Sequence, residues 1–172
     1  MTEPSLNPAL EGVRYCPRCA ASAVVAFPRS IACETCGYQA YYNPKPVACA
    51  IPREPDGRVW LLRRAFAPGA GLWTFPGGFV DLGETVEDGA RRETREELEI
   101  EIEIGPLVGV YSRADDRVVL IVFAAQALGP PRTTPEATEV RAFAPHDIPW
   151  ETLAFWSTAQ ALRDLLGSPD RG

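Results

Sequence analysis

Three glutamates have a spacing that a helix would convert into a cluster of carboxylates. Glu93, Glu96 and Glu97 lie three and four positions apart, which places helical side chains on one face within an arc of about 100°. Carboxylates this crowded repel one another unless a cation neutralises them. Hard divalent ions such as Mg²⁺ and Mn²⁺ prefer oxygen ligands. The spacing is therefore typical of a divalent-metal site.

A solvated helix face is the alternative interpretation of this segment. Between Glu84 and Glu103 nine acidic residues stand against three arginines, so the segment carries the whole net charge of −6. Glutamates and arginines on one helix often simply pair in solvent. The preceding loop, Phe75-Pro76-Gly77-Gly78, favours a site instead, because two glycines let the backbone approach a metal ion or a phosphate closely.

The segment from Gly78 to Ile100 reads G-x5-E-x7-R-E-x-x-E-E and resembles the signature of the Nudix hydrolases. Enzymes of that family bind Mg²⁺ on a loop–helix–loop and catalyse the attack of water on a diphosphate bond of a nucleoside diphosphate derivative. The sequence departs from the signature at Glu99, where the family usually has glycine. We expect Glu99 to cap the helix rather than to take part in chemistry.

The resemblance implies a role for each matching residue. Glu93 and Glu97 would be the leading metal ligands, helped by Glu96 and the carbonyl group of Gly77. Arg92 would orient these carboxylates as part of the catalytic set.

The identity of the general base is left open between two parts of the sequence. Glu93 and Glu96 are candidates from the signature, and Glu136 and Glu139 are candidates from a later loop. The residues expected to support the site and lie against the substrate are Gly78, Glu84, Glu136 and Glu139.

Four cysteines form a second chemical motif near the N-terminus. Cys16-x-x-Cys19 and Cys33-x-x-Cys36 have the spacing of a tetrahedral zinc site, in which each pair supplies two thiolates. Disulfides or reduced thiols are the alternatives. We expect structural zinc, because so short a segment has too little core to fold unaided. Cys49 lies in an apolar strand and is expected to be a buried, unreactive residue.

The remaining pattern predicts the elements that position these residues. Helices are expected from the N-cap Thr85 to about Leu98 and over 155–166. Strands are expected over 47–51, 58–64, 99–104, 118–127 and 140–144, with Glu99, Glu101 and Glu103 on an outer face. A Gly/Pro-rich loop spans 67–78. Together with the resemblance this predicts an α/β/α sandwich on a mixed sheet, with a zinc ribbon over 13–42 and a Nudix domain over 43–168.

The arrangement of ribbon, Tyr41-Tyr42-Asn43-Pro44 linker and hydrolase domain is similar to a Nudix group that acts on ADP-ribose and FAD. NADH pyrophosphatases also join a ribbon to a Nudix domain, but their SQPWPFP signature is missing. A second class of function is a non-catalytic protein that binds nucleotides or nucleic acid. The ribbon offers few cations for a phosphate-tracking surface, since only Arg18 and Arg29 are basic between Cys16 and Cys36.

Several smaller expectations complete the prediction. No signal peptide or membrane-length apolar run is present, which favours a cytoplasmic protein with a small nucleotide substrate and no membrane partner. The resemblance suggests a homodimer. Aromatic residues that could stack on a base are Phe66, Trp73, Tyr111 and Phe143, although Trp73 is a better candidate for core packing. His146, the one histidine, is expected in a surface turn.

Overall fold

The computed structural model describes residues 10–26 and 29–167. The chain divides into two compact units, one ending at Pro44 and the other beginning at Lys45. In the first unit, β1 (Val24–Ala26), β2 (Ser30–Ala32) and β3 (Gln39–Tyr41) form a three-stranded antiparallel sheet. Among the described residues, no helix is long and apolar enough to cross a membrane.

The second unit is built on a mixed sheet with the strand order β10-β5-β4-β9-β8. Its central pair, β4 and β9, is parallel, and the other neighbours on this path are antiparallel. Two short strands, β6 and β7, pair with β5 and β4 respectively. The strands are β4 (Lys45–Arg53), β5 (Val59–Arg64), β6 (Trp73–Thr74), β7 (Gly77–Phe79), β8 (Ile102–Tyr111), β9 (Val118–Ala127) and β10 (Ala137–Phe143).

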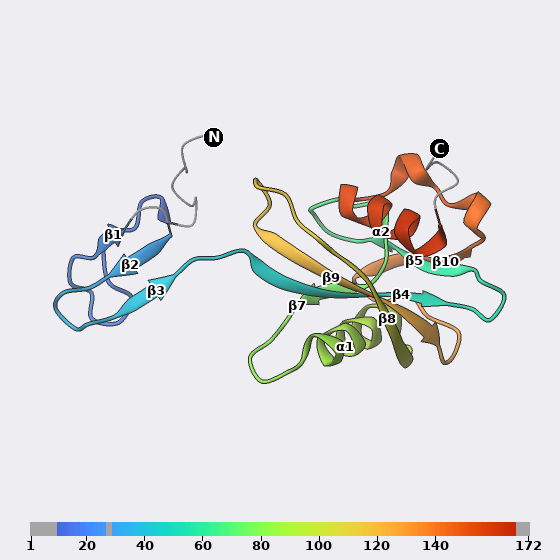
Figure 1. Cartoon of the computed structure of the whole chain (residues 1–172), viewed down its shortest axis with the longest axis horizontal. Helices are drawn as coiled ribbons and strands as arrows, with labels where there is room; N and C mark the ends of the chain where they lie inside the picture. Colours follow the sequence, from blue (N-terminus) through green and yellow to red (C-terminus); the bar gives the residue numbers. More distant parts are fainter. Residues whose placement is uncertain (1–9, 27–28, 168–172) are drawn as a thin grey trace. The chain divides into compact units, whose positions relative to one another are not determined.

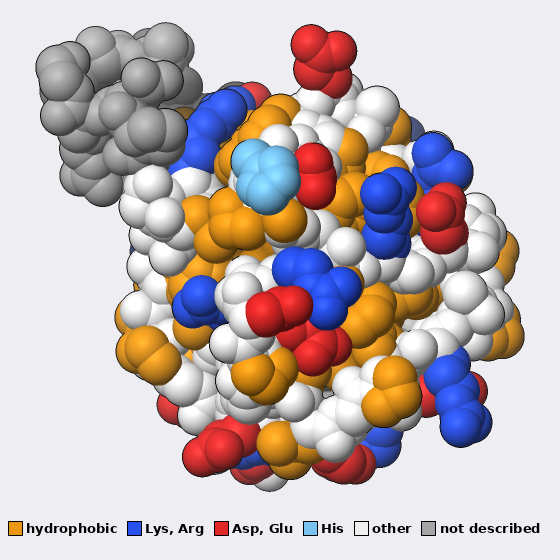
Figure 2. Space-filling view, turned by 90° about the vertical axis from the view of Figure 1, so that its right-hand side faces the viewer, with side chains coloured by type: hydrophobic (Ala, Val, Ile, Leu, Met, Phe, Trp, Pro, Cys, Tyr) orange, Lys and Arg blue, Asp and Glu red, His pale blue; other side chains and the backbone are white. Residues whose placement is uncertain are grey.

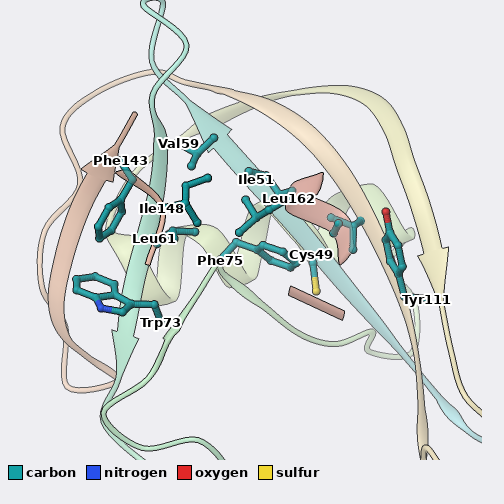
Figure 3. Packing of buried hydrophobic residues seen from close by; sticks show 12 residues of the cluster. Cys49, Ile51, Val59, Leu61, Trp73, Phe75, Tyr111, Phe143, Ile148 and Leu162 are labelled. Atoms are coloured by element: carbon teal, nitrogen blue, oxygen red, sulfur yellow. The ribbon is translucent and has the colours of Figure 1, made fainter. Parts of the chain in front are cut away.

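Helices α1 (Val86–Leu98) and α2 (Trp156–Leu166) lie on opposite faces of this sheet (Figure 1), and two short 3-10 turns, Pro145–Asp147 and Trp150–Thr152, precede α2. Alternation along β4 explains the two layers, because successive strand side chains point to opposite faces. Ala48 and Ala50 pack in the cluster that contains Ala90 and Leu98 of α1. Cys49 and Ile51 pack in the cluster that contains Leu162 of α2 (Figure 3). The predicted α/β/α sandwich with a mixed sheet is confirmed.

Local signals account for both ends of α1. The hydroxyl group of Thr85 accepts a hydrogen bond from the Asp88 backbone N–H at 3.1 Å, which satisfies one free amide of the first turn. At the other end Glu99 adopts a left-handed conformation with φ 54°, and its N–H donates to the carbonyl group of Arg95. The predicted helix limits and the capping role of Glu99 are confirmed.

Three expected element limits were wrong. The strand expected over 99–104 begins only at Ile102, because Glu99 still closes the helix, and it runs on to Tyr111. The last strand covers 137–143 instead of 140–144. The loop expected over 67–78 contains β6 and the start of β7, whose short pairings with β5 and β4 are tertiary contacts that local composition does not reveal.

Candidate metal and catalytic site

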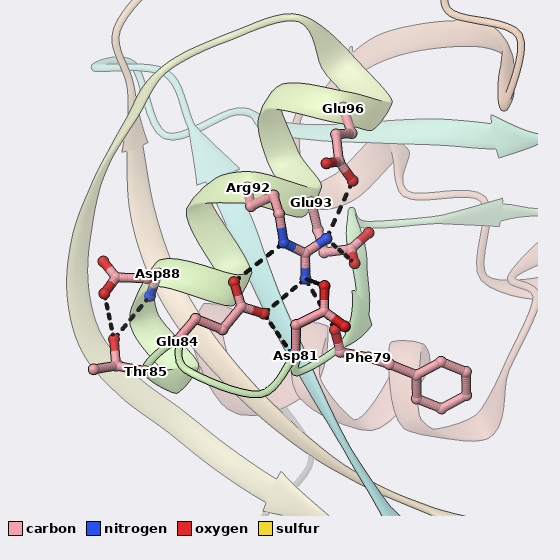
Figure 4. Close-up of polar contacts among 8 residues, drawn as sticks. All are labelled: Phe79, Asp81, Glu84, Thr85, Asp88, Arg92, Glu93 and Glu96. Atoms are coloured by element: carbon pink, nitrogen blue, oxygen red, sulfur yellow. Dashed lines mark hydrogen bonds and ion pairs between the residues drawn. The ribbon is translucent and has the colours of Figure 1, made fainter.

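Arg92 is the centre of the polar network on α1 (Figure 4). Its guanidinium group binds the Glu84 carboxylate through two hydrogen bonds, Nε–Oε2 at 3.1 Å and Nη2–Oε1 at 2.7 Å. It also donates to Glu93 at 2.7 Å, to Glu96 at 3.2 Å and to the carbonyl group of Phe79 at 3.0 Å. One planar side chain thus fixes three carboxylates relative to the loop before the helix.

Glu97 is tied to the same loop from the next turn of α1. It is buried, and its Oε2 accepts a hydrogen bond from the backbone N–H of Gly77 at 2.9 Å. The side chain of Glu93 is also largely covered, with 15% exposed, whereas that of Glu96 is 56% exposed. Because Glu93 and Glu97 lie in the interior, a solvated helix face does not describe them.

The two glycines leave the space that these carboxylates occupy. A Cβ atom on Gly78 would collide with the carboxylate of Glu93, and one on Gly77 would collide with the Cys49 sulfur and crowd the Ala48 carbonyl group. Side chains at either position would therefore push β7 away from α1 and β4. The absence of side chains at Gly77 and Gly78 thus lets β7 lie close to Cys49 and Glu93, and the expected approach of this backbone to a metal ion or a phosphate stays a prediction.

Burial has an electrostatic consequence for the carboxylates of this site. Burial raises the pKa of Glu97 to about 7, against the lowering effect of the Gly77 N–H, and the charge of Glu93 raises it further. Burial also raises the pKa of Glu93, opposed by Arg92. The pKa of Glu84, in contrast, is lowered to about 2 by its hydrogen bonds with Arg92 and with the Asp81 N–H. Glu93 and Glu97 are thus oxygen donors whose charged form a divalent cation would stabilise.

The two later-loop candidates have different surroundings. Glu136 lies close enough to the cluster for its charge to raise the pKa of both Glu93 and Glu97, after burial as the main cause. Its segment is held there because the Thr134 hydroxyl group donates to the Glu97 carbonyl group at 3.1 Å. Glu139 instead forms an ion pair with Arg63 at 3.1 Å. The structure therefore brings Glu136, and not Glu139, to the carboxylate cluster.

A cavity of about 390 Å³ adjoins Gly77 and Gly78. Its apolar walls come from the sheet and from the segment that enters α2, and its polar lining residues include Arg64, Asp116 and Ser157. The apolar and aromatic lining residues include Val47, Cys49, Leu120, Phe75, Phe79, Phe155 and Trp156. A concave, mostly apolar space with a few polar groups is the usual form of a small-molecule pocket.

None of the four aromatic residues suggested for base stacking lines this cavity. Trp73, Tyr111 and Phe143 are buried in the core, where Trp73 packs edge-on against Phe143 with ring centroids 5.0 Å apart. Phe66 is 62% exposed and does not line the cavity. Sequence reasoning missed Phe155 and Trp156, because only the fold brings the start of α2 to the signature loop.

The four cysteines of the first unit converge on one point. Their sulfur atoms lie within 4.8 Å of one another, with Cys16–Cys36 at 3.7 Å and Cys19–Cys33 at 3.6 Å. Zinc–sulfur bonds of about 2.3 Å in a tetrahedron require sulfurs about 3.8 Å apart, and disulfide bonds would require about 2.05 Å. The donor set fits zinc.

Two other predictions on single residues are confirmed. Cys49 is 3% exposed, and burial, followed by the charges of Glu97 and Glu93, raises the pKa of its thiol. His146, the pale blue side chain in Figure 2, lies in the turn before α2 with its side chain 81% exposed.

Fold and site together define a hydrolase of the kind that the signature indicates. A profile of the NUDIX domain matches residues 43–165. The chain therefore belongs to the Nudix family and is a Nudix hydrolase.

Three known proteins are similar to this chain in structure or in sequence. A NUDIX hydrolase from Nitrosomonas europaea has a crystal structure that is similar with a TM-score of 0.80 and 34% identity, covering 87% of this chain and 88% of that one. An ADP-ribose pyrophosphatase of Methanocaldococcus jannaschii is 36% identical over 54% of this chain and 56% of its own length. The NAD-capped RNA hydrolase NudC of Haemophilus influenzae is 36% identical over 42% of this chain and 28% of its own. The chain thus matches about half or less of these two curated relatives.

Proposed function

We propose that this chain hydrolyses a diphosphate linkage in a nucleoside diphosphate derivative, ADP-ribose or FAD in the first place, and releases AMP. The observation that carries the proposal is the buried Glu97 carboxylate, bound to the Gly77 N–H and close to Glu93, beside a cavity lined with aromatic residues. The similarity to an ADP-ribose pyrophosphatase supports the choice of substrate.

Glu93 and Glu97 are the proposed ligands for Mg²⁺ or Mn²⁺, with Glu96 and the carbonyl group of Gly77 as further oxygen donors. When bound, the cation would lower the pKa of a water molecule and screen the diphosphate charge. Arg92 and Glu84 would keep the carboxylates aimed at the loop through their hydrogen bonds. In the first unit, the four cysteines are proposed to hold a structural zinc ion.

Glu136 is the best-placed general base from the later loop. It would take the proton of the attacking water as the oxygen–phosphorus bond forms and the bond from that phosphorus to the bridging oxygen breaks. Glu93 and Glu96 remain the alternatives from the signature, but both already accept hydrogen bonds from Arg92, which occupy carboxylate lone pairs that a general base needs for the proton.

A substrate panel tests the proposal. ADP-ribose, FAD, NADH and NAD-capped RNA should be compared with Mg²⁺ and Mn²⁺, and AMP identified among the products. We expect Glu97→Gln to lower turnover at least about 100-fold. Glu103→Gln, a matched change on the exposed side of β8, should leave turnover nearly unchanged.

Two outcomes of the panel would change the conclusion. Preferred cleavage of NADH or NAD-capped RNA would support the alternative suggested by the similarity to NudC. No hydrolysis of any substrate with either cation would contradict the proposal and favour a non-catalytic nucleotide-binding protein.

A further inference from the structure

Adjacent arginines at the end of β5 have different environments. Arg63 forms its ion pair with Glu139 at 3.1 Å, and its guanidinium carbon lies 5.3 Å from the centre of the Trp73 ring. Arg64 lines the cavity next to Gly77 and Gly78. Successive strand residues point to opposite faces, and of the two arginines only Arg64 lines the cavity.

The Arg64 side chain is held in place, but some of its hydrogen-bond donors are not used within the protein. Its Nε donates to the carbonyl group of Pro68 at 2.7 Å, and its guanidinium carbon lies 5.3 Å from the centre of the Phe155 ring. Within the described part of the chain, its two terminal nitrogens have no hydrogen-bond partner and no carboxylate lies within 4.0 Å. This guanidinium group therefore has free donors in a fixed orientation.

Arg64 also lies between the two parts of the site. It is the one cation among the described residues that line the cavity. Its charge reaches Glu97, where it opposes the rise in pKa that burial causes. Asp116, the one carboxylate of the cavity lining, is engaged elsewhere, because its Oδ2 accepts a hydrogen bond from the Arg113 N–H at 3.0 Å.

We propose that Arg64 binds a phosphate of the substrate's diphosphate, and that the aromatic cavity takes the ring of the nucleoside attached to it. The planar fork of arginine matches two phosphate oxygens, and apolar and aromatic walls suit a flat ring. The substrate would then extend from the cavity past Arg64 to the carboxylates of α1. This inference rests on the proposed function and specifies how its substrate is oriented.

Ligand binding tests this orientation without requiring turnover. The probes are α,β-methylene-ADP, which resists cleavage between its phosphates, and adenosine, which has the ring without phosphate. Binding of each is measured by calorimetry in the presence of Mg²⁺ for the full chain, for Arg64→Gln and for the matched control Arg63→Gln. We expect Arg64→Gln to weaken the binding of α,β-methylene-ADP about 10- to 100-fold. The binding of adenosine should weaken less than about twofold. Arg63→Gln should change neither.

Each result supports or overturns the inference. An equal loss of affinity for both ligands in Arg64→Gln would show that Arg64 only shapes the cavity by packing on Phe155. An unchanged affinity for α,β-methylene-ADP would show that it does not contact phosphate. Ribose, which has the sugar without the ring, is the comparison for adenosine: if the unmodified chain binds adenosine no more tightly than ribose, the cavity does not take the ring.

The proposed function can fail separately. Without hydrolysis in the substrate panel, a phosphate-specific loss in Arg64→Gln would still support the binding mode and contradict only the catalysis. Hydrolysis that is unaffected by Arg64→Gln, with unchanged binding, would contradict this inference alone.

Discussion

Gly78 shows how a single hydrogen atom in place of a side chain positions the carboxylates. The residue belongs to β7, which pairs with β4, and a Cβ atom there would collide with the carboxylate of Glu93. Glu93 in turn accepts a hydrogen bond from Arg92. The loop, the glutamate and the arginine therefore fit together only while position 78 has no side chain.

We expect Gly78→Ala to displace Glu93 and weaken Mg²⁺ or Mn²⁺ binding about 10- to 100-fold, with a loss of stability of about 1–3 kcal/mol from overpacking. Cation titration and urea unfolding measure the two effects. Gly129→Ala is the matched control, because a Cβ atom there has no heavy atom within 4 Å. Unchanged cation affinity in Gly78→Ala would show that Glu93 does not bind the cation.

At the scale of elements, α1 ends in a residue that is poorly suited to its conformation. Glu99 has φ 54°, a left-handed conformation that side chains with a Cβ atom adopt at a cost. Glycine is usual at such a position after a helix. The chain tolerates glutamate there because the cap hydrogen bond to Arg95 and the burial of the following Ile100 fix the turn.

Glu99→Gly is therefore expected to stabilise the second unit by about 1 kcal/mol, since the relief of left-handed strain exceeds the added freedom of the unfolded chain. Urea unfolding followed by circular dichroism measures the change. Glu87→Gly, in the first turn of α1, should have the opposite effect, a loss of stability of up to about 1 kcal/mol. A lower midpoint for Glu99→Gly would mean that the glutamate side chain contributes more than its backbone costs.

Those elements also show what local sequence was able to predict. The Thr85 cap and the end at Glu99 are signals within one helix, and the structure has both of them. The cysteine pairs are equally local. Spacing within a short segment was sufficient because the helix or turn itself brings such residues together.

The cavity is the opposite case, since its parts are distant along the chain. Arg64 comes from β5, and Phe155 and Trp156 come from the start of α2. Nothing in either segment indicates that the sheet places them beside Gly77. Trp73, an aromatic residue near the signature, was suggested for base stacking, but it packs in the core against Phe143.

At the scale of the whole molecule, the two units have very different means of staying folded. The unit from Lys45 onward has two apolar clusters, one under each helix. In the first unit the fully buried large side chains among the described residues are Leu10 and Ile31, together with the buried Cys16 and Cys33. Burying two such side chains contributes about 3–6 kcal/mol, far less than the conformational entropy lost by roughly 30 ordered residues.

Zinc is therefore expected to supply most of the stability of the first unit, where binding free energies of about 10–16 kcal/mol are typical of cysteine sites. We predict one zinc ion per chain by elemental analysis, and its loss in Cys33→Ser but not in Cys49→Ala, which leaves all four ligands in place. After chelation, hydrogen exchange should become fast in the ribbon amides that are now bonded, such as those of Gly37 and Cys33. Amides of β4 and β9 should stay protected, because their sheet has its own core. Ribbon amides that remain protected without zinc would mean that something other than the metal holds this unit together.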